Sequence, residues 1–220
     1  MRLLDLVLPM RCAGCSGPGE LLCARCRGRL TRIAPPLCDR CGAPTAWPVA
    51  RCAECSGRRL AFATARGAVV YDDTVRQLVA GWKEHGLRRL AELAAEVVVE
   101  ALERPDAAVI TFVPPDLDRT LRRGHHPAER LARGLGERWQ VPVEALLARR
   151  RAAPRQRGLT LADRRRNVAG AFEPRAHAPS RVILVDDVYT SGATAGAGAS
   201  ALRRGGARLV SVITFARAVR

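Results

Sequence analysis

The sequence predicts an α/β domain built on a parallel sheet and preceded by a small cysteine-rich unit. Three observations lead to this fold class. All eight cysteines lie within residues 12–55, apolar strands alternate with helices from about residue 61 onward, and one strand, RVILVDD, runs into the loop VYTSGAT. A chain of 220 residues has room for one medium domain and a small appendage. We therefore expect two units, residues 1–60 and residues 61–220.

The cysteines form four CxxC pairs. A CxxC turn places two thiolates on one side of a tight knuckle, and two knuckles complete a tetrahedral zinc site. Disulfides are disfavoured because the chain shows no export signal and no cysteine elsewhere, and redox chemistry would need only one pair. We predict two structural zinc ions, each held by four cysteines, with sequential and interleaved pairings both open. The ligands are Cys12, Cys15, Cys23, Cys26, Cys38, Cys41, Cys52 and Cys55.

The elements of the second unit follow from the hydrophobic pattern. Strands are predicted over residues 65–73, 107–115, 181–187 and 207–217. Helices are predicted over residues 74–103 with a break near Gly86, over residues 127–139 with proline in the first turn, and over residues 194–204. Helices that alternate with continuously apolar strands indicate a doubly wound parallel sheet covered on both faces.

The strand that ends in two acids predicts a ligand site, because ligands of such sheets bind beyond the carboxyl ends of the strands. Backbone N–H groups of the following loop, freed by a glycine and backed by a helix N-terminus, form a cradle for a monophosphate. Asp186 and Asp187 can accept hydrogen bonds from sugar hydroxyls and stay near a Mg²⁺ ion. We therefore predict a ribose 5-phosphate ligand. The loop residues are Thr190, Ser191, Gly192, Ala193 and Thr194.

Other phosphate motifs fit this loop less well. A Walker A loop requires a lysine that the loop lacks, and Gly192, Gly196 and Gly198 do not have the spacing of a dinucleotide-binding loop. In the simplest alternative the two acids are ordinary helix caps, although one aspartate would be enough for that purpose.

Charge and hydropathy limit the classes of partner and the location that we expect for the protein. The net charge is +16, which favours anionic partners such as nucleotides, phosphate esters or nucleic acid. Arginine is enriched along the whole chain, with Lys83 as the single lysine, and this weakens the indication of nucleic acid. The N-terminal MRLLDLVLPM is too short for a signal peptide or a membrane span, and no later segment is long and apolar enough to cross a bilayer. We expect a soluble, cytoplasmic protein.

Together these motifs resemble the ComF family of competence proteins. The resemblance rests on the eight-cysteine double zinc ribbon, GWKEHG, VPPDLDRTLRRGHHPAERLA, and RQRGLTLADRRRNVAGAF followed by VILVDDVYTSGAT. It implies a type I phosphoribosyltransferase-like domain that binds phosphoribosyl pyrophosphate with Mg²⁺, with Asp186 and Asp187 at the ribose and residues 190–194 at the 5-phosphate. It also implies a link to DNA uptake, with single-stranded DNA and proteins of the competence machinery as partners, at the periphery of a membrane uptake complex.

The resemblance extends to individual basic residues. It implies that the loop after Val113 faces the pyrophosphate, with Arg119 and Arg123 nearby as charge partners; a solvated helix start is the alternative. Lys83 stands where the family shows a Phe-Lys-Tyr-like motif, either as a phosphate contact or as a lysine without a function. The family's Arg-Gly-Phe-Asn-Gln is Arg-Gly-His-His-Pro at residues 123–127, so contacts of its two amides are lost or remade, and protonated histidines could take a phosphate.

Residues 148–170 are the most basic stretch of the chain. A charge run without apolar periodicity predicts a solvated loop, which could close over the pyrophosphate or track a nucleic acid backbone. Two functions remain open. The first is a protein that binds phosphoribosyl pyrophosphate and takes part in DNA handling, and the second is an active phosphoribosyltransferase with an unknown acceptor.

Overall fold

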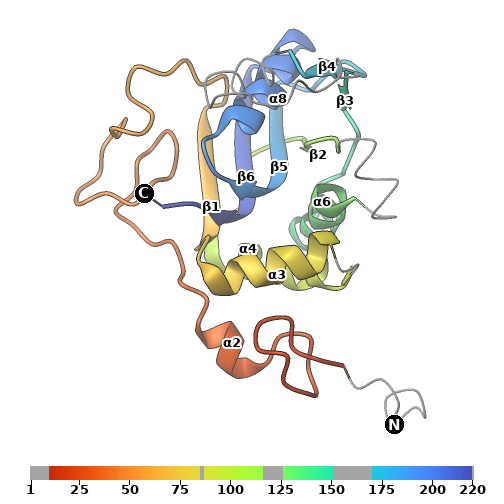
Figure 1. The fold of residues 1–220 in the computed structure, drawn as a ribbon. Helices are drawn as coiled ribbons and strands as arrows, with labels where there is room; N and C mark the ends of the chain where they lie inside the picture. Colours follow the sequence, from red (N-terminus) through yellow and green to blue (C-terminus); the bar gives the residue numbers. More distant parts are fainter. Residues whose placement is uncertain (1–9, 85–86, 116–125, 151–169, 220) are drawn as a thin grey trace, which may run out of the picture.

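The computed structural model describes residues 10–84, 87–115, 126–150 and 170–219. At its centre lies a four-stranded sheet (Figure 1), in which all neighbouring strands pair in parallel. The strand order is β1 (Thr64–Val70), β6 (Leu209–Arg217), β5 (Arg181–Tyr189) and β2 (Val109–Phe112). The parallel sheet predicted from the apolar strands is confirmed.

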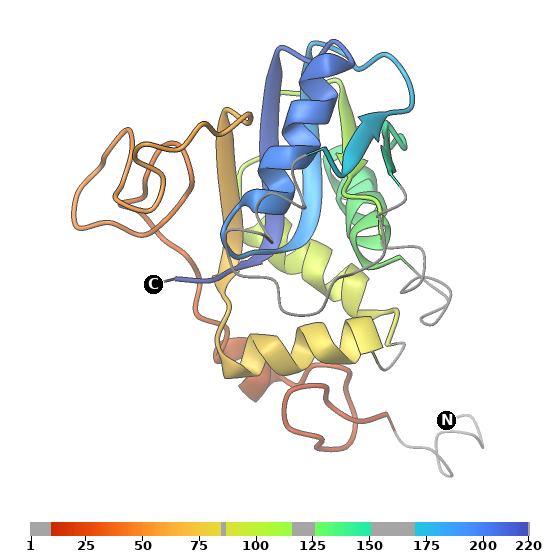
Figure 2. The ribbon, with the colours of Figure 1, turned by 45° about the horizontal axis from the view of Figure 1, so that its top comes forward.

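Helices cover both faces of this sheet (Figure 2). One face carries α3 (Asp73–Glu84), α4 (Leu90–Ala101) and α6 (Pro127–Trp139), and the other carries α8 (Ala193–Arg204). Alternate residues of β5 serve the two faces, since Ile183 and Val185 pack with the three helices while Val182 and Leu184 pack with α8. This two-sided burial explains why the strands are apolar throughout. Neither these helices nor any other in the described residues is long and apolar enough to cross a bilayer.

Two element boundaries and one additional strand pair sharpen or extend what the sequence pattern predicts. The long helical segment forms two helices, because α3 ends at Glu84 and α4 begins at Leu90. Strand β5 continues two residues beyond its predicted end, because it pairs with β6 as far as Tyr189 and Arg217. A small antiparallel pair was not predicted, since strands of three residues are too short to show a period. Its strands are β3 (Leu147–Arg149) and β4 (Phe172–Pro174).

The two cysteine-rich segments attach to different faces of the sheet. We call residues 10–30, which include α2 (Ala24–Gly28), the first ribbon, and residues 37–60 the second ribbon. The first ribbon packs against α3 and α4 and contributes Leu22 and Leu30 to their apolar cluster. The second ribbon lies beside the edge strand β1 (Figure 1) and contributes Leu60 to the cluster on the α8 face.

Candidate functional site

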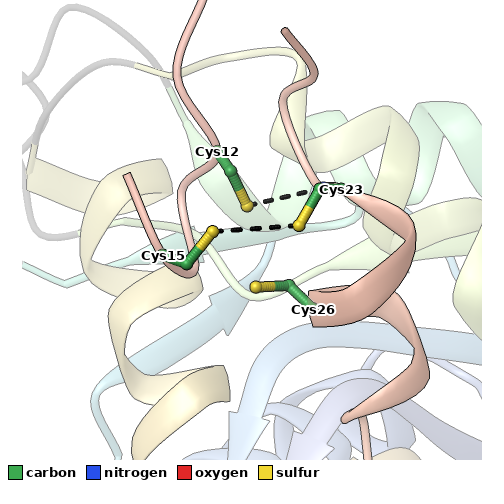
Figure 3. Close-up of side chains that lie close together, drawn as sticks. All are labelled: Cys12, Cys15, Cys23 and Cys26. Carbon is green, nitrogen blue, oxygen red and sulfur yellow. Dashed lines mark hydrogen bonds between the residues drawn. The ribbon is translucent and has the colours of Figure 1, made fainter. Parts of the chain in front are cut away.

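The eight cysteines gather into two groups of four, and Figure 3 shows the first group. Within each group all four Sγ atoms lie within 4.8 Å of one another. The grouping follows the order of the chain, which resolves the pairing that the sequence leaves open. The first cluster is Cys12, Cys15, Cys23 and Cys26, and the second cluster is Cys38, Cys41, Cys52 and Cys55.

In each cluster the surroundings favour ionisation of one thiol, whereas burial and hydrogen bonds with neighbouring thiols raise the pKa of Cys26, Cys41 and Cys55 when no metal is bound. Backbone N–H groups of Gly14 and Cys23 each donate to Cys12 Sγ at 3.4 Å. Burial acts against ionisation of Cys12, but these hydrogen bonds outweigh it and lower the pKa of its thiol to about 6. In the second cluster the N–H of Cys52 donates to Cys38 Sγ at 3.3 Å, and the pKa of Cys38 is likewise lowered to about 6 against the effect of burial. Four thiolates without an open position are the ligand set of structural zinc, so the clusters fit two structural zinc sites.

The phosphate loop, residues 190–194, connects β5 to α8. Gly192 is the N-cap residue of α8 and has a φ of 71°. A Cβ atom at this position would lie 2.2 Å from the hydroxyl oxygen of Tyr189, so only glycine fits. The first amides of a helix have no intrahelical acceptors and lie at the positive end of its dipole. Together with Asp186 and Thr214, the loop lines a depression with about 230 Å³ of empty space, part of it open solvent.

The two adjacent acids have different surroundings. Asp186 is half-buried and lines the depression beside the phosphate loop. Asp187 is 9% exposed and pairs with Lys83 of α3, its Oδ2 atom lying 2.7 Å from Nζ. Burial and the charge of Asp187 raise the pKa of Asp186 to about 7. The sequence alone gives the two adjacent carboxylates the same role, whereas in the structure Asp186 faces the phosphate loop and Asp187 faces α3.

A second cation lies near Asp186. Arg149, at the end of β3, donates from Nε to the carbonyl oxygen of Pro114 at 3.4 Å, and its guanidinium lies 5.0 Å from the centre of the Phe172 ring. The positive charges of Lys83 and Arg149 both act to lower the pKa of Asp186. The sequence presents Arg149 only as a member of the basic stretch, most of which lies outside the described residues.

Of the residues that the family resemblance assigns to the segment before α6, the structure describes His126. Arg119, Arg123 and His125 lie outside the described residues. His126 precedes α6 and its Nε2 atom lies 3.1 Å from the carbonyl oxygen of Val113. Burial lowers the pKa of His126, so its ring is neutral near pH 7. This environment does not favour the protonated phosphate ligand that the sequence suggested.

Comparison with known proteins agrees with this architecture. A family model for the double zinc ribbon domain matches residues 3–56. Competence protein F of Haemophilus influenzae is 28% identical over 94% of this chain and 97% of its own length. The DNA utilization protein YhgH of Escherichia coli (strain K12) is 30% identical over 96% of this chain and 99% of its own. The chain belongs to the ComF family. Competence protein ComFC of Bacillus subtilis shares 26% identity with this ComF-family chain, over 91% of the chain and 85% of ComFC.

Solved structures similar to this ComF chain include two enzymes. "The allosteric regulatory enzyme of purine biosynthesis" has a TM-score of 0.41 and 24% identity over 57% of the chain, which spans 25% of that enzyme. The adenine phosphoribosyltransferase of Thermoanaerobacter pseudethanolicus has a TM-score of 0.39 and 12% identity over 69% of the chain and 90% of the enzyme. TM-scores of this size do not establish a common fold. The predicted parallel-sheet α/β domain with a double zinc ribbon before it is confirmed by the strand order and the family model.

Proposed function

We propose that this ComF-family protein binds phosphoribosyl pyrophosphate with Mg²⁺, and that this binding serves DNA uptake or nucleic acid handling. The observation that carries the proposal is the position of Asp186 beside a glycine-containing loop at a helix N-terminus, in one depression. The 5-phosphate would accept hydrogen bonds from the backbone N–H groups of residues 190–194. The ribose hydroxyls would donate to Asp186.

The charges around the acids support binding of a pyrophosphate together with a metal ion. Mg²⁺ is usually held by one or two carboxylates and by the phosphates of the substrate, and Asp186 supplies such an oxygen ligand at the depression. In this assignment Lys83 and Arg149 provide positive charge toward the pyrophosphate, and the ion pair with Asp187 keeps Lys83 in place. Arg119 and Arg123 complete the assignment through the family resemblance.

The link to DNA is supported by the names of relatives, which are called competence and DNA utilization proteins. A net charge of +16 also suits a polyanionic partner. We assign residues 1–60 to the ribbon unit and residues 61–220 to the ligand-binding unit. The proposed partners are single-stranded DNA and proteins of an uptake complex. The proposed location is the cytoplasm, at the periphery of that complex.

Isothermal titration calorimetry with phosphoribosyl pyrophosphate and Mg²⁺ tests the proposal. We expect micromolar affinity for the unmodified protein and at least a roughly 10-fold weaker affinity for Asp186→Asn. Asp106→Asn is the matched control, because Asp106 forms an ion pair with Arg181 at the opposite end of β5 and should leave the affinity unchanged. Absence of binding by a folded, zinc-loaded protein would overturn the proposal.

A second candidate function is turnover as a phosphoribosyltransferase. The geometry of the depression favours it, because the loop that would hold the 5-phosphate and the carboxylate that would hold the ribose lie together there. In this reaction the acceptor forms a bond to C1 of the ribose, the bond from C1 to the pyrophosphate oxygen breaks, and the acceptor's proton passes to the solvent. Release of pyrophosphate that requires both an acceptor and Asp186 would support turnover. If phosphoribosyl pyrophosphate binds but no tested acceptor causes release of pyrophosphate, only the binding function is supported.

A further inference from the structure

The second ribbon contacts the phosphate loop directly. Arg58 follows Cys55 by three residues, and its Nη2 atom donates to the carbonyl oxygen of Ser191 at 2.6 Å. Its Nη1 atom donates to the carbonyl oxygen of Glu54 at 3.4 Å, within the turn of the second cluster. The half-buried guanidinium of Arg58 therefore bridges the cysteine turn and the loop.

A second contact runs through the end of β6. The side chain of Arg217 is 1% exposed and donates to the carbonyl oxygen of Cys41 at 2.8 Å and to Oε2 of Glu54 at 2.7 Å. Its guanidinium lies 4.6 Å from the centre of the Tyr189 ring. The hydroxyl of Tyr189 in turn occupies the space that a side chain at Gly192 would need. Through Arg217, the second cluster is therefore linked to the Tyr189 ring, which packs against Gly192 of the loop.

The second ribbon has a fixed position from which to make these contacts. Gly42 has a φ of 68°, and a Cβ atom there would lie 2.3 Å from the carbonyl oxygen of Ala65 in β1. The N–H of Ala65 donates to the carbonyl oxygen of Arg40 at 3.0 Å. The backbone of the second ribbon is therefore bonded to the edge strand β1. Arg58 contacts the loop from this anchored ribbon, and Arg217 contacts the ribbon from the end of β6.

We propose that the second ribbon is a positioning element for the phosphate loop, and that an intact second cluster is required for the loop to hold its shape. The inference rests on the proposed function of the loop as a phosphate site. Its physical basis is the geometry of one peptide group. The carbonyl oxygen of Ser191 and the N–H of Gly192 belong to one planar trans peptide and point in opposite directions. When Arg58 holds the carbonyl oxygen, it also fixes the direction of that N–H.

Amide hydrogen exchange of the zinc-loaded protein without ligand tests this inference. We expect exchange in residues 188–196 to be about 10-fold faster in Arg58→Ala than in the unmodified protein, because one hydrogen bond to the loop is lost. Arg58→Lys retains a donor and should restore most of the protection. Arg27→Ala is the matched control, because Arg27 belongs to the first ribbon and pairs with Glu96 of α4 at 3.6 Å. It should leave exchange of the loop unchanged.

Further measurements keep this inference separate from the proposed function. Tyr189→Leu leaves the hydrogen bonds of Arg58 in place and should also accelerate exchange of the loop while two zinc ions stay bound. Loop exchange equal to that of the unmodified protein in both Arg58→Ala and Tyr189→Leu would overturn the inference. Calorimetry with phosphoribosyl pyrophosphate runs in parallel. Failure of the unmodified protein to bind would refute the proposed function, whereas the exchange result would still decide the role of the ribbon.

Discussion

The two ribbons share their four-cysteine chemistry but have different neighbours. The first ribbon joins the apolar cluster of α3 and α4, and its Arg27 pairs with Glu96 and Glu100 on α4. The second ribbon joins the cluster on the α8 face and bonds to the phosphate loop through Arg58. The first ribbon therefore covers a helical face, and the second also reaches the candidate ligand site.

This difference shows that the ligand set of a zinc site does not define what the ribbon does. The two acids, Asp186 and Asp187, are divided in the same way between the two faces of the sheet. Asp187 is paired with Lys83 on α3, which packs against the first ribbon, and Asp186 faces the loop that the second ribbon supports. Variants that affect one ribbon and not the other can therefore separate stability from ligand binding.

The largest expected effect comes from one cysteine in each cluster. Cys23 and Cys52 are both half-buried and both begin the second CxxC pair of their cluster. Cys23→Ser and Cys52→Ser should each lower bound zinc from two ions to one and destabilise the fold by about 5 kcal/mol or more. Only Cys52→Ser should also weaken binding of phosphoribosyl pyrophosphate, by roughly 10-fold or more. Metal analysis with calorimetry checks this, and equal loss of affinity in both variants would contradict the comparison.

A smaller effect is expected from one arginine at each ribbon. Arg217→Met removes a buried guanidinium and leaves the Glu54 carboxylate without its partner, which should cost about 3 kcal/mol of unfolding free energy. Arg27→Met removes the exposed ion pairs of Arg27 with Glu96 and Glu100, and should cost less than about 1 kcal/mol. Urea denaturation measures both values. Similar costs for the two variants would mean that the buried guanidinium of Arg217 does not stabilise the second ribbon.

The features that sequence reasoning identified are contiguous in the chain. Four CxxC pairs and a strand followed by residues 190–194 each carry their chemistry within a few residues, so spacing alone predicts them. The contact between Arg58 and Ser191 joins distant parts of the chain, and Arg58 is one of many arginines. No local pattern distinguishes it. Lys83 was identified because it is the single lysine and stands where the family shows a Phe-Lys-Tyr-like motif, and the structure pairs it with Asp187.

The division of the two acids was not predicted, although both lie within the predicted strand over residues 181–187 and within β5 (Arg181–Tyr189). Successive strand residues point to opposite sides of a sheet, so Asp186 and Asp187 separate. Which partner each side meets depends on helices that are distant in the sequence. Thr214 was also missed, although a polar residue within an apolar strand is a signal that could have located it. Its side chain is buried where it lines the depression.

The smallest expected effect distinguishes the two acids by pH. The pKa of Asp186 is about 7 in the folded protein and 3.8 ordinarily, so the folded state binds this proton more tightly than the unfolded state. Ionisation of Asp186 therefore costs no stability below about pH 4, costs more as the pH rises toward 7, and reaches its full cost above pH 7. Asp186→Asn removes this cost. In Mg²⁺-free buffer it should stabilise the protein by roughly 2–3 kcal/mol more at pH 8 than at pH 5.

Asp187→Asn should have the opposite sign at pH 8. It breaks the ion pair with Lys83, whose side chains are 26% and 12% exposed, so it removes a favourable contact and leaves a half-buried ammonium group unpaired. Urea unfolding of both variants at pH 5 and pH 8 gives the two signs directly. If both substitutions destabilise the protein equally at pH 8, the carboxylates share one environment, and the assignment of one acid to the loop and the other to α3 fails.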